Sequence, residues 1–211
     1  MSKLASLSRL TLPIRTHSGR STMTIAAAAF AMLTVAPGAM AQMDIEAGTQ
    51  AREADEAEQK SLMIGDPAPE IDVEHWIKGD EVSKFKDDNI YVVEFWATWC
   101  PPCRTSMPHL SDLQQKYKDQ NVHILGISDE DETTVSQFLT SDDWPEKTQY
   151  TLATDPDRSV FRDYMTAAGK SGIPTAFIVG RDQKIEWIGH PMSMDEPLQK
   201  VVAGEWDAEA Y

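Results

Sequence analysis

Cysteine is nearly absent from this sequence: only two of its 211 residues are cysteines, Cys100 and Cys103. A framework of several disulfides is therefore excluded, and no second cysteine pair is present to complete a structural zinc site of four protein ligands. Arg104 follows Cys103 at the position where covalent haem attachment needs a histidine. A disulfide between the two cysteines would close a very short loop and add little stability. The pair is better explained by thiol chemistry than by a structural role.

Positive charge is scarce outside the N-terminal region. The formal net charge of the chain is −15, and residues 42–211 carry −19, because residues 1–41 hold four basic residues and no acidic ones. A body this acidic repels nucleic acid and anionic lipid, and no basic cluster offsets the repulsion. We therefore expect no nucleic-acid partner.

Long hydrophobic runs are missing as well. The apolar run Ile25–Ala36 has 12 residues, which is well short of the roughly 20 needed to span a bilayer. A basic segment precedes this run, and the small residues Ala39 and Ala41 follow it around Met40. This order is typical of a secretory signal peptide, which we place at residues 1–41 with cleavage after Ala41. An uncleaved membrane anchor and an organellar presequence are the alternatives.

The segment after the signal is acidic and has no aromatic residue or proline between residues 43 and 61. It shows no convincing apolar face that could dock on a core. We interpret residues 42–63 as an acidic linker. A turn signal at Gly65–Ile71 then opens a single domain, residues 64–208, whose length suits one hydrophobic core.

Strand and helix patterns alternate along this domain. The nearly continuous apolar runs at residues 90–96 and 122–128 predict strands that are covered on both faces. Apolar residues spaced by three or four predict a helix after the cysteines, and they are Met107, Leu110, Leu113 and Tyr117. Further helices are predicted at residues 133–139, from Asp155-Pro156 through Met165, and around residues 198–202.

The remaining strands are predicted at residues 149–155 and in two hairpins. One hairpin crosses Gly79–Asp80 and joins residues 70–77 to residues 81–85, and the other crosses Arg181–Asp182 and joins residues 175–180 to residues 184–189. Alternating strands and helices with a hairpin near the end indicate an α/β sandwich, in which helices flank a mixed central sheet.

The position of Cys100 favours a reactive thiol, since it follows a buried strand and opens a helix. The positive end of a helix dipole and its unpaired N–H groups stabilise a thiolate, which is the form that attacks disulfides. Cys103 lies one turn further along, close enough to displace a mixed disulfide. Pro101 and Pro102 suit the first helical positions and remove two N–H donors, so the Cys103 amide should be the donor nearest the Cys100 sulfur.

The stretch VVEFWATWCPPC, residues 92–103, resembles the active-site strand and turn of the thioredoxin superfamily, especially its exported TlpA/ResA-like thiol–disulfide oxidoreductases. Pro108 matches the family's helix-kinking proline, and GIPTAF, residues 172–177, matches its cis-proline loop. The resemblance runs from about Gly65 to Gly204. It implies a thioredoxin-like three-layer sandwich with an N-terminal hairpin and an inserted strand and helix.

The resemblance also implies roles for individual residues. Cys100 would be the nucleophile and Cys103 the resolving thiol, and Pro174 would lie against the CPPC turn. Ile173 and Pro174 would line the substrate groove together with Trp99, although plain packing also explains this tryptophan. Glu94 would be a buried acid with a raised pKa that relays protons for Cys103. A surface-facing glutamate is the alternative.

A reductase of protein disulfides is the function that the resemblance implies. It would act in an extracytoplasmic space, periplasmic or secreted, without a cofactor or a bound metal. A membrane thiol relay would be its electron donor, and cytochrome maturation is one process it could supply. The sequence itself does not set the direction of electron flow.

Two other functions remain open at this stage. A thiol peroxidase of the peroxiredoxin kind would share the fold, but its cysteine normally follows a threonine by three residues, where this chain has Ala97. A copper-binding module could use Cys100 and Cys103 with His190, because soft ligands also occur nearby at Met192 and Met194.

Overall fold

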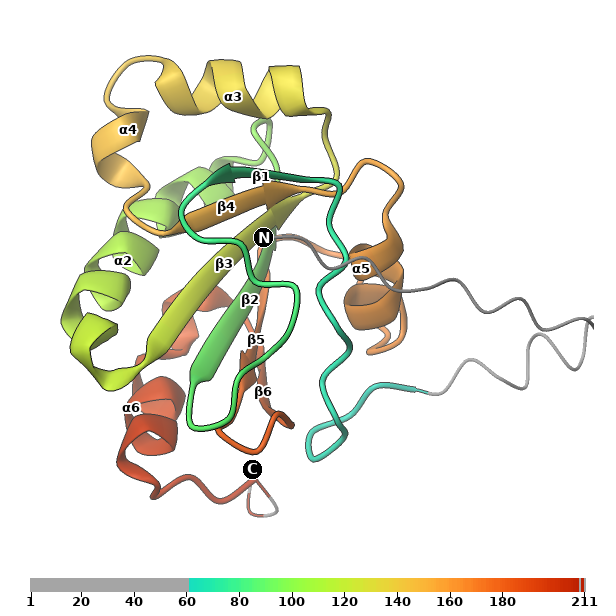
Figure 1. Cartoon of the computed structure of the whole chain (residues 1–211), viewed down its shortest axis with the longest axis vertical. Helices are drawn as coiled ribbons and strands as arrows, with labels where there is room; N and C mark the ends of the chain where they lie inside the picture. The colour runs from blue at the N-terminus through green and yellow to red at the C-terminus, as the bar shows by residue number, and fades with distance from the viewer. Residues whose placement is uncertain (1–60, 209, 211) are drawn as a thin grey trace, which may run out of the picture. The chain divides into compact units, whose positions relative to one another are not determined.

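Strand β2 (Ile90–Trp96) lies inside a six-stranded sheet in the computed structural model, which describes residues 61–208 and 210 (Figure 1). The strand order is β1-β4-β3-β2-β5-β6. The other strands are β1 (His75–Lys78), β3 (Val122–Ser128), β4 (Thr151–Thr154), β5 (Thr175–Val179) and β6 (Ile185–Gly189). The predicted signal peptide and the linker up to residue 60 lie outside the described residues.

Helical segments connect these strands. The α-helices are α2 (Pro101–Tyr117), α3 (Glu132–Thr140), α4 (Trp144–Lys147), α5 (Ser159–Phe161) and α6 (Asp195–Ala203). Short 3-10 turns are formed by η1 (Lys118–Gln120) and η3 (Pro191–Ser193), and the π-helical segment η2 (Arg162–Thr166) follows α5 directly.

The sheet is mixed, as predicted. β2 and β4 both run parallel to β3, whereas β5 is antiparallel to β2 and to β6, and β1 is antiparallel to β4. Because β2 is hydrogen-bonded on both sides, the residues that follow it emerge at the middle of one sheet edge. Cys100 is among these residues.

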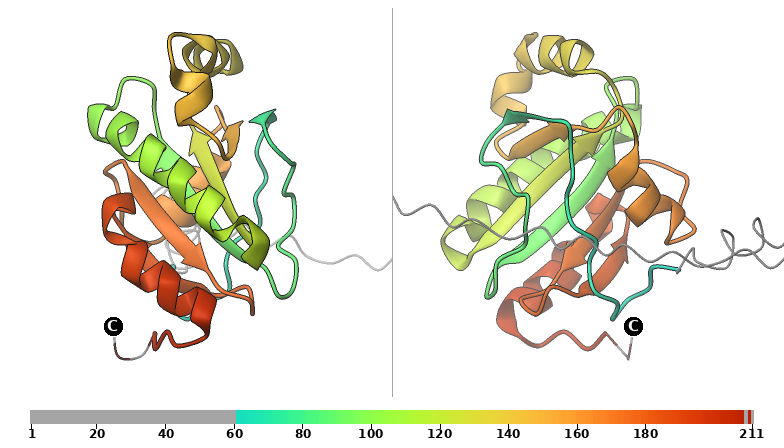
Figure 2. Two further views of the ribbon diagram at one scale, coloured as in Figure 1. Left: turned by 90° about the vertical axis from the view of Figure 1, so that its left-hand side faces the viewer. Right: turned by 45° about the vertical axis from the view of Figure 1, so that its right-hand side comes forward.

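Side chains of β2 alternate between two cores, one on each face of the sheet. Val92 and Trp96 belong to a core covered by α2, α3, α4 and α6, whereas Val93 and Phe95 belong to a core covered by α5 and η2. Figure 2 shows α2 and α6 side by side over the first face. Burying each large apolar side chain contributes about 1.5–3 kcal/mol, which is why the apolar residues of β2 are all buried.

Helix α2 buries the apolar stripe that its sequence predicts: the four residues of that stripe are all buried. Pro101 and Pro102 take the first two helical positions, where a missing N–H removes no intrahelical bond. Pro108 lies inside the helix, so the Arg104 carbonyl has no i+4 amide to accept from. Helix α2 therefore begins at the CPPC turn and is locally weakened one turn later.

The predicted N-terminal hairpin is wrong. Residues 81–85 form no strand, and β1 pairs with β4 instead, with Trp76 opposite Ala153. Gly79 does turn the chain, at a φ of +83°, but it does so close against Thr151 of β4. Val82 and Phe85 then pack against the core under α5 and η2 instead of pairing with β1.

The helix predicted from Asp155-Pro156 begins later than expected, at Ser159. Asp155 is buried, and its carboxylate accepts the Val160 N–H at 2.9 Å and the Ser159 hydroxyl at 3.1 Å. These bonds hold residues 155–158 as a turn ahead of α5. The predicted C-terminal hairpin between β5 and β6 and the predicted final helix, α6, are both present.

The described chain is already part of the fold at Leu62, near the end of the predicted linker. Leu62 is buried and its N–H donates to the Ala167 carbonyl at 2.9 Å. Gly65 donates to the Ile185 carbonyl at 2.7 Å. Within the described part of the chain, no helix has the length and apolar character needed to cross a membrane.

Candidate active site

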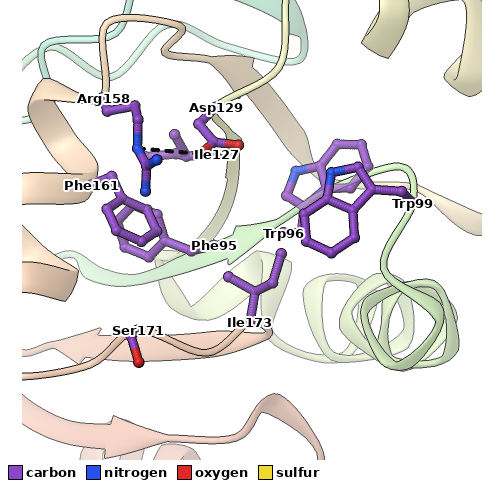
Figure 3. A pocket seen from close by; sticks show the side chains of 9 residues that line it. All are labelled: Phe95, Trp96, Trp99, Ile127, Asp129, Arg158, Phe161, Ser171 and Ile173. Atoms are coloured by element: carbon purple, nitrogen blue, oxygen red, sulfur yellow. Dashed lines mark ion pairs between the residues drawn. The ribbon is translucent and has the colours of Figure 1, made fainter.

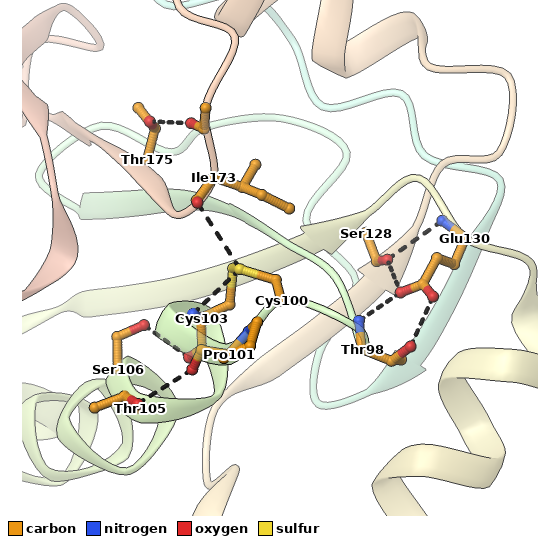
Figure 4. Close-up of a disulfide and its surroundings, with 11 residues drawn as sticks. Thr98, Cys100, Pro101, Cys103, Thr105, Ser106, Ser128, Glu130, Ile173 and Thr175 are labelled. Carbon is orange, nitrogen blue, oxygen red and sulfur yellow. Dashed lines mark hydrogen bonds between the residues drawn. A yellow bond between two sulfur atoms is a disulfide. The ribbon is translucent and has the colours of Figure 1, made fainter.

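Cys100 ends the turn that follows β2 and is the N-cap of α2 (Figure 4). Its N–H donates to the Ala97 carbonyl at 3.1 Å, which closes a four-residue turn. The Cys103 N–H donates to the Cys100 Sγ at 3.2 Å, so the expected amide is a donor to this sulfur. No acidic residue lies in the first turn of α2. The sulfur of Cys100 therefore lies at a helix N-terminus whose first turn carries no acidic side chain, which favours a thiolate in the reduced state.

The two cysteines form a disulfide in this structure, with their Cα atoms 5.3 Å apart. Cys103 is fully buried and Cys100 nearly so, with a relative exposure of 2%. The prolines between them are exposed. The structure therefore describes the oxidised state of a dithiol pair that is buried directly beneath two exposed prolines.

The loop Gly172–Thr175 lies against this disulfide. The Ile173–Pro174 peptide bond is cis, and Pro174 is buried. The Ile173 carbonyl oxygen lies 3.8 Å from the Cys100 Sγ, and in the reduced state a Cys100 thiol could donate to it. The Thr175 hydroxyl donates to the Gly172 carbonyl at 2.7 Å and closes the loop (Figure 4). The sequence motif GIPT thus meets the CPPC turn.

Glu130 holds the turn that precedes Cys100, a role that no sequence motif predicts. Its Oε2 accepts the Thr98 N–H at 2.6 Å and its Oε1 accepts the Thr98 hydroxyl at 2.7 Å. The Ser128 hydroxyl donates to the same carboxylate at 3.1 Å. The acidic residues at positions 129–132 fit the N-terminus of a helix, and Asp131, next to Glu130, does cap α3. The only signal for Glu130 is its place just after β3, beside the end of β2.

Glu94 is fully buried, so a surface position is excluded. Burial raises the pKa of its carboxyl group from the ordinary 4.5 to about 8. Within the described residues, neither carboxyl oxygen has a hydrogen-bond partner. The group can therefore hold or release a proton near neutral pH, which is the property a proton carrier needs.

Trp99 is exposed beside the disulfide, with 68% of its surface accessible. It forms one wall of a pocket of about 180 Å³ that Ile173, Phe95 and Phe161 also line (Figure 3). On the opposite side, the Arg158 guanidinium lies 4.3 Å from the centre of the Phe161 ring and its Nε is 3.4 Å from Asp129. The pocket is thus an aromatic hollow with an ion pair at its rim, next to the Cys100 turn.

The features of the two alternative functions are not assembled here. The Thr98 hydroxyl donates its hydrogen bond to Glu130, so it is not available to the Cys100 sulfur as a peroxidase threonine would be. His190 accepts the Met192 N–H on its Nδ1, and Met194 is buried. In the residues that the structure covers, no group of three or more His, Cys, Asp or Glu side chains is placed to hold a metal ion.

Comparisons with known proteins agree with this geometry. The model of the AhpC/TSA family matches residues 64–188. Protein FixW of Rhizobium leguminosarum is 31% identical over 159 residues, which cover 70% of each chain. The thiol-disulfide oxidoreductase ResA of Bacillus cereus is 29% identical over 133 residues, which cover 61% of this chain and 70% of ResA.

A solved structure supports the same assignment. The crystal structure of a putative thiol:disulfide interchange protein DsbE from Chlorobium tepidum has a TM-score of 0.55 and 26% sequence identity. The match covers 69% of this chain and 99% of that one. With the family model spanning more than half of the sequence and a disulfide at the CPPC turn, the chain belongs to the AhpC/TSA family of thioredoxin-fold proteins and is a ResA-like thiol–disulfide oxidoreductase.

Proposed function

We propose that this chain is an exported reductase of protein disulfides, with Cys100 as the nucleophile and Cys103 as the resolving thiol. The observation that carries the proposal is the place of the Cys100 Sγ, which caps the 17-residue helix α2 and accepts the Cys103 N–H. A helix N-terminus lowers the pKa of a thiol, so reduced Cys100 would attack as a thiolate. Cys103 lies behind it in the core and would meet only a disulfide already attached to Cys100.

The reaction has two exchange steps. The Cys100 thiolate attacks one sulfur of the substrate disulfide, that bond breaks, and the other substrate sulfur leaves as a thiolate and is protonated. Cys103 then loses its proton and its thiolate attacks the Cys100 Sγ. The intermolecular bond breaks, and the second substrate sulfur leaves and takes up a proton. Two electrons pass from the dithiol to the substrate, and the chain is left with the Cys100–Cys103 disulfide.

Glu94 would accept the proton that Cys103 loses in the second step. Its carboxyl group lies on β2 beneath α2, and burial holds its pKa at about 8, close to that of a free thiol. A proton exchanged between groups of similar pKa costs little free energy in either direction.

The substrate would lie across the surface formed by Trp99, Ile173 and Pro174. The exposed indole and the adjacent pocket offer an apolar contact for a side chain near the substrate cysteine. Pro174 has no N–H and so cannot compete for the Cys100 sulfur. Protein thiols and disulfides are accordingly the substrates, in agreement with the relatives named above.

The location and the electron donor are also part of the proposal. The predicted signal at residues 1–41 supports export, and the linker at residues 42–63 would precede a redox domain at 64–208. Re-reduction of the disulfide needs an external dithiol, for which a membrane thiol relay is the natural source in an oxidising compartment. Delivery of electrons for cytochrome maturation would be one use of such a reductase.

Single-cysteine variants test the assignment of roles. With dithiothreitol as donor and a disulfide-bonded protein as substrate, Cys100→Ser should lose essentially all reduction, because no nucleophile remains. Cys103→Ser, reduced and then freed of dithiothreitol before the substrate is added, should instead accumulate a covalent complex with the substrate, which a thiol reagent releases. Substrate reduction by Cys100→Ser at the rate of the unaltered protein would overturn the proposal.

The reduction potential tests the direction of electron flow. Equilibration in defined thiol buffers should give a value near that of thioredoxin, roughly −270 mV, if the chain is a reductase. A value near about −120 mV would mark a donor of disulfides and overturn the reductase assignment.

A further inference from the structure

The sequence surrounds Glu94 with very small residues. In the sheet, Glu94 pairs with Gly126 on β3 and with Ala176 on β5, and Ala176 in turn pairs with Gly189 on β6. All of these positions lie in one row across the sheet, and Val92 and Trp96, two residues to either side of Glu94, face the core under α2. The carboxyl group therefore points into this core with only Gly126 and Ala176 beside it in the row, and Leu152 of β4 is the next large side chain beyond Gly126.

Leu152 and three aromatic side chains occupy the space that the small residues leave, and the Leu152 Cδ2 would lie 2.7 Å from a Cβ atom on Gly126. A Cβ atom on Gly126 would lie 3.1 Å from the Tyr150 Cε2 and 3.2 Å from the Trp96 Nε1, so both rings lie beside this glycine. The Trp187 ring lies over Gly189, where an added Cβ would collide with it. Burial raises the pKa of the Tyr150 hydroxyl, and the charge of Glu94 raises it further.

Each of these aromatic groups carries a polar hydrogen that is not used. The Tyr150 hydroxyl, the Trp96 Nε1 and the Trp187 Nε1 are buried and have no hydrogen-bond partner among the described residues, and neither has the Glu94 carboxyl group. Buried polar groups in proteins are nearly always hydrogen-bonded, either to the protein or to ordered water. Three donors and one acceptor left together in the same core layer are the lining that a bound water needs.

We propose that Tyr150, Trp96 and Trp187 bind ordered water against the Glu94 carboxyl group, and that Tyr150 and Trp187 thereby act as positioning residues for its proton. The inference rests on the proposed role of Glu94 in the reaction and deepens it. Water that donates to the carboxyl group stabilises its ionised form. The donors thus oppose the effect of burial and keep Glu94 able to release a proton as well as to hold one.

Few other titratable groups face this site. Helix α2 contributes Cys100 and Cys103 to the core layer, and the segment ahead of β4 contributes Tyr150. Strands β3 and β5 face Glu94 with Gly126 and Ala176, which do not titrate. Burial is the cause of the raised pKa of Glu94, so a lost donor should be visible as a change in its titration.

The test is a pH titration of the Glu94 carboxyl stretch by infrared spectroscopy on the oxidised, full chain. Glu94→Gln identifies the band. Tyr150→Phe and Trp187→Phe should each lower the ionisation constant of Glu94 about fivefold, because each removes one donor to the bound water. The pH midpoint of the Cys103 resolution step should move upward by the amount that corresponds to this fivefold change.

Tyr117→Phe is the matched control. Its hydroxyl is also buried and unpartnered among the described residues, in the same core, but it lies 14 residues beyond Cys103 on α2, or roughly 21 Å along the helix. This variant should leave the titration of Glu94 unchanged while losing the same hydroxyl group.

Two results would overturn the water site. One is an unchanged Glu94 midpoint in both folded variants. The other needs no variant. It is a Glu94 carbonyl stretch, in the unaltered protein, at the frequency of a carboxylic acid that makes no hydrogen bond. Since the titration uses the resting disulfide form without substrate, it is independent of the Cys100→Ser assay. If neither variant shifts the pH midpoint of Glu94 while the unaltered protein is an active reductase, the water site alone is rejected.

Discussion

A carboxyl group that is buried without a partner among residues 61–208, as Glu94 is, weakens a fold at every pH at which the unfolded chain would ionise it. Its pKa is about 8 in the folded state against an ordinary 4.5, so the folded chain binds this proton more tightly than the unfolded chain. The contribution of Glu94 to stability is therefore greatest below the unfolded pKa and is lost as the pH rises toward the folded one. Each unit of that interval is worth about 1.36 kcal/mol.

Glu94→Gln should remove this pH dependence. The variant should be more stable than the unaltered protein by about 3 kcal/mol near neutral pH, and the difference should shrink toward acid pH, where both side chains are neutral. The measurement is the free energy of unfolding in urea from about pH 5 to about pH 9. Glu132→Gln, an exposed change on α3, is the control. A difference that stays constant across this range would contradict the buried, protonated state of Glu94.

Glu94→Gln should stabilise the fold and also impair the proposed reaction. A glutamine cannot take the Cys103 proton, so the resolution step should slow even as the fold is strengthened. Active sites often retain groups that cost stability because the chemistry needs them. In the proposed mechanism Glu94 is such a group, at the centre of the sheet.

At the scale of elements, the CPPC turn depends on a contact between two loops. The turn after β2 is held by Glu130, which lies between β3 and α3 and accepts both the N–H and the hydroxyl of Thr98. Because the bonds to this carboxylate are charge-assisted, they are stronger than neutral ones. The parallel pairing of β2 with β3 brings the two loops to the same edge. Cys100 is thus positioned by the sheet register as well as by its own helix.

Glu130→Gln tests this contact. The free energy of unfolding should fall by about 1–2 kcal/mol, because a neutral amide replaces a charged acceptor. A carboxylate close to the turn also opposes the Cys100 thiolate, so its removal should favour the reduced form. We expect the equilibrium constant with glutathione to shift about threefold, or about 14 mV at 29.6 mV per tenfold.

Glu132→Gln is again the control, since it removes the same charge from the exposed first turn of α3. Its potential should match that of the unaltered protein. Equal shifts in the two variants would show a general effect of net charge, and no shift in Glu130→Gln would remove Glu130 from the redox centre.

The elements that could be predicted from the sequence are those whose signal is local. The buried run of β2, the apolar stripe of α2 and the CPPC turn are each contained in a few consecutive residues, and all are present. The prediction of a hairpin across Gly79–Asp80 was wrong. Tertiary packing decides whether β1 pairs with residues 81–85 or with β4, and it pairs with β4.

The candidate site was predictable to the same extent. Cys100, Cys103 and the GIPT loop have sequence motifs, and the structure brings them together. Glu130 and Tyr150 have no sequence motif. Glu130 meets the Cys100 turn because β2 pairs with β3, and Tyr150 lies beside Gly126 because this glycine has no side chain. A long-range pairing must be known before such residues can be recognised.

For the whole molecule, the open question at the N-terminus is where the independently stable unit begins. Residues 62–68 are tied to the far edge of the sheet: Gly65 donates to the Ile185 carbonyl, and Ile185 donates back to the Asp66 carbonyl at 2.9 Å. Ala68 donates to the Gln183 carbonyl at 2.9 Å. This segment therefore covers the start of β6, and only its first two residues precede the family match, which starts at residue 64.

A pair of truncations locates the boundary. A chain that begins at Ser61 should keep the urea midpoint and the reduction potential of the full-length protein, because every contact described above is retained. A chain that begins at Val73 loses the buried side chains of Leu62 and Ile71 as well as the bonds to β6. Its free energy of unfolding should fall by about 4 kcal/mol or more, at roughly 2 kcal/mol for each buried aliphatic side chain.

The two truncations also separate stability from redox function. The backbone-to-backbone hydrogen bonds between residues 62–72 and the rest of the described chain go to Ala167, Gln183 and Ile185, and none of them goes to the CPPC turn. If the shorter chain still folds, it should therefore keep the reduction potential of the Cys100–Cys103 pair. Equal stability of the two truncated chains would show that residues 61–72 belong to the linker. A loss of stability already at Ser61 would show that the preceding acidic residues contribute to the domain, which would move its boundary upstream of residue 61.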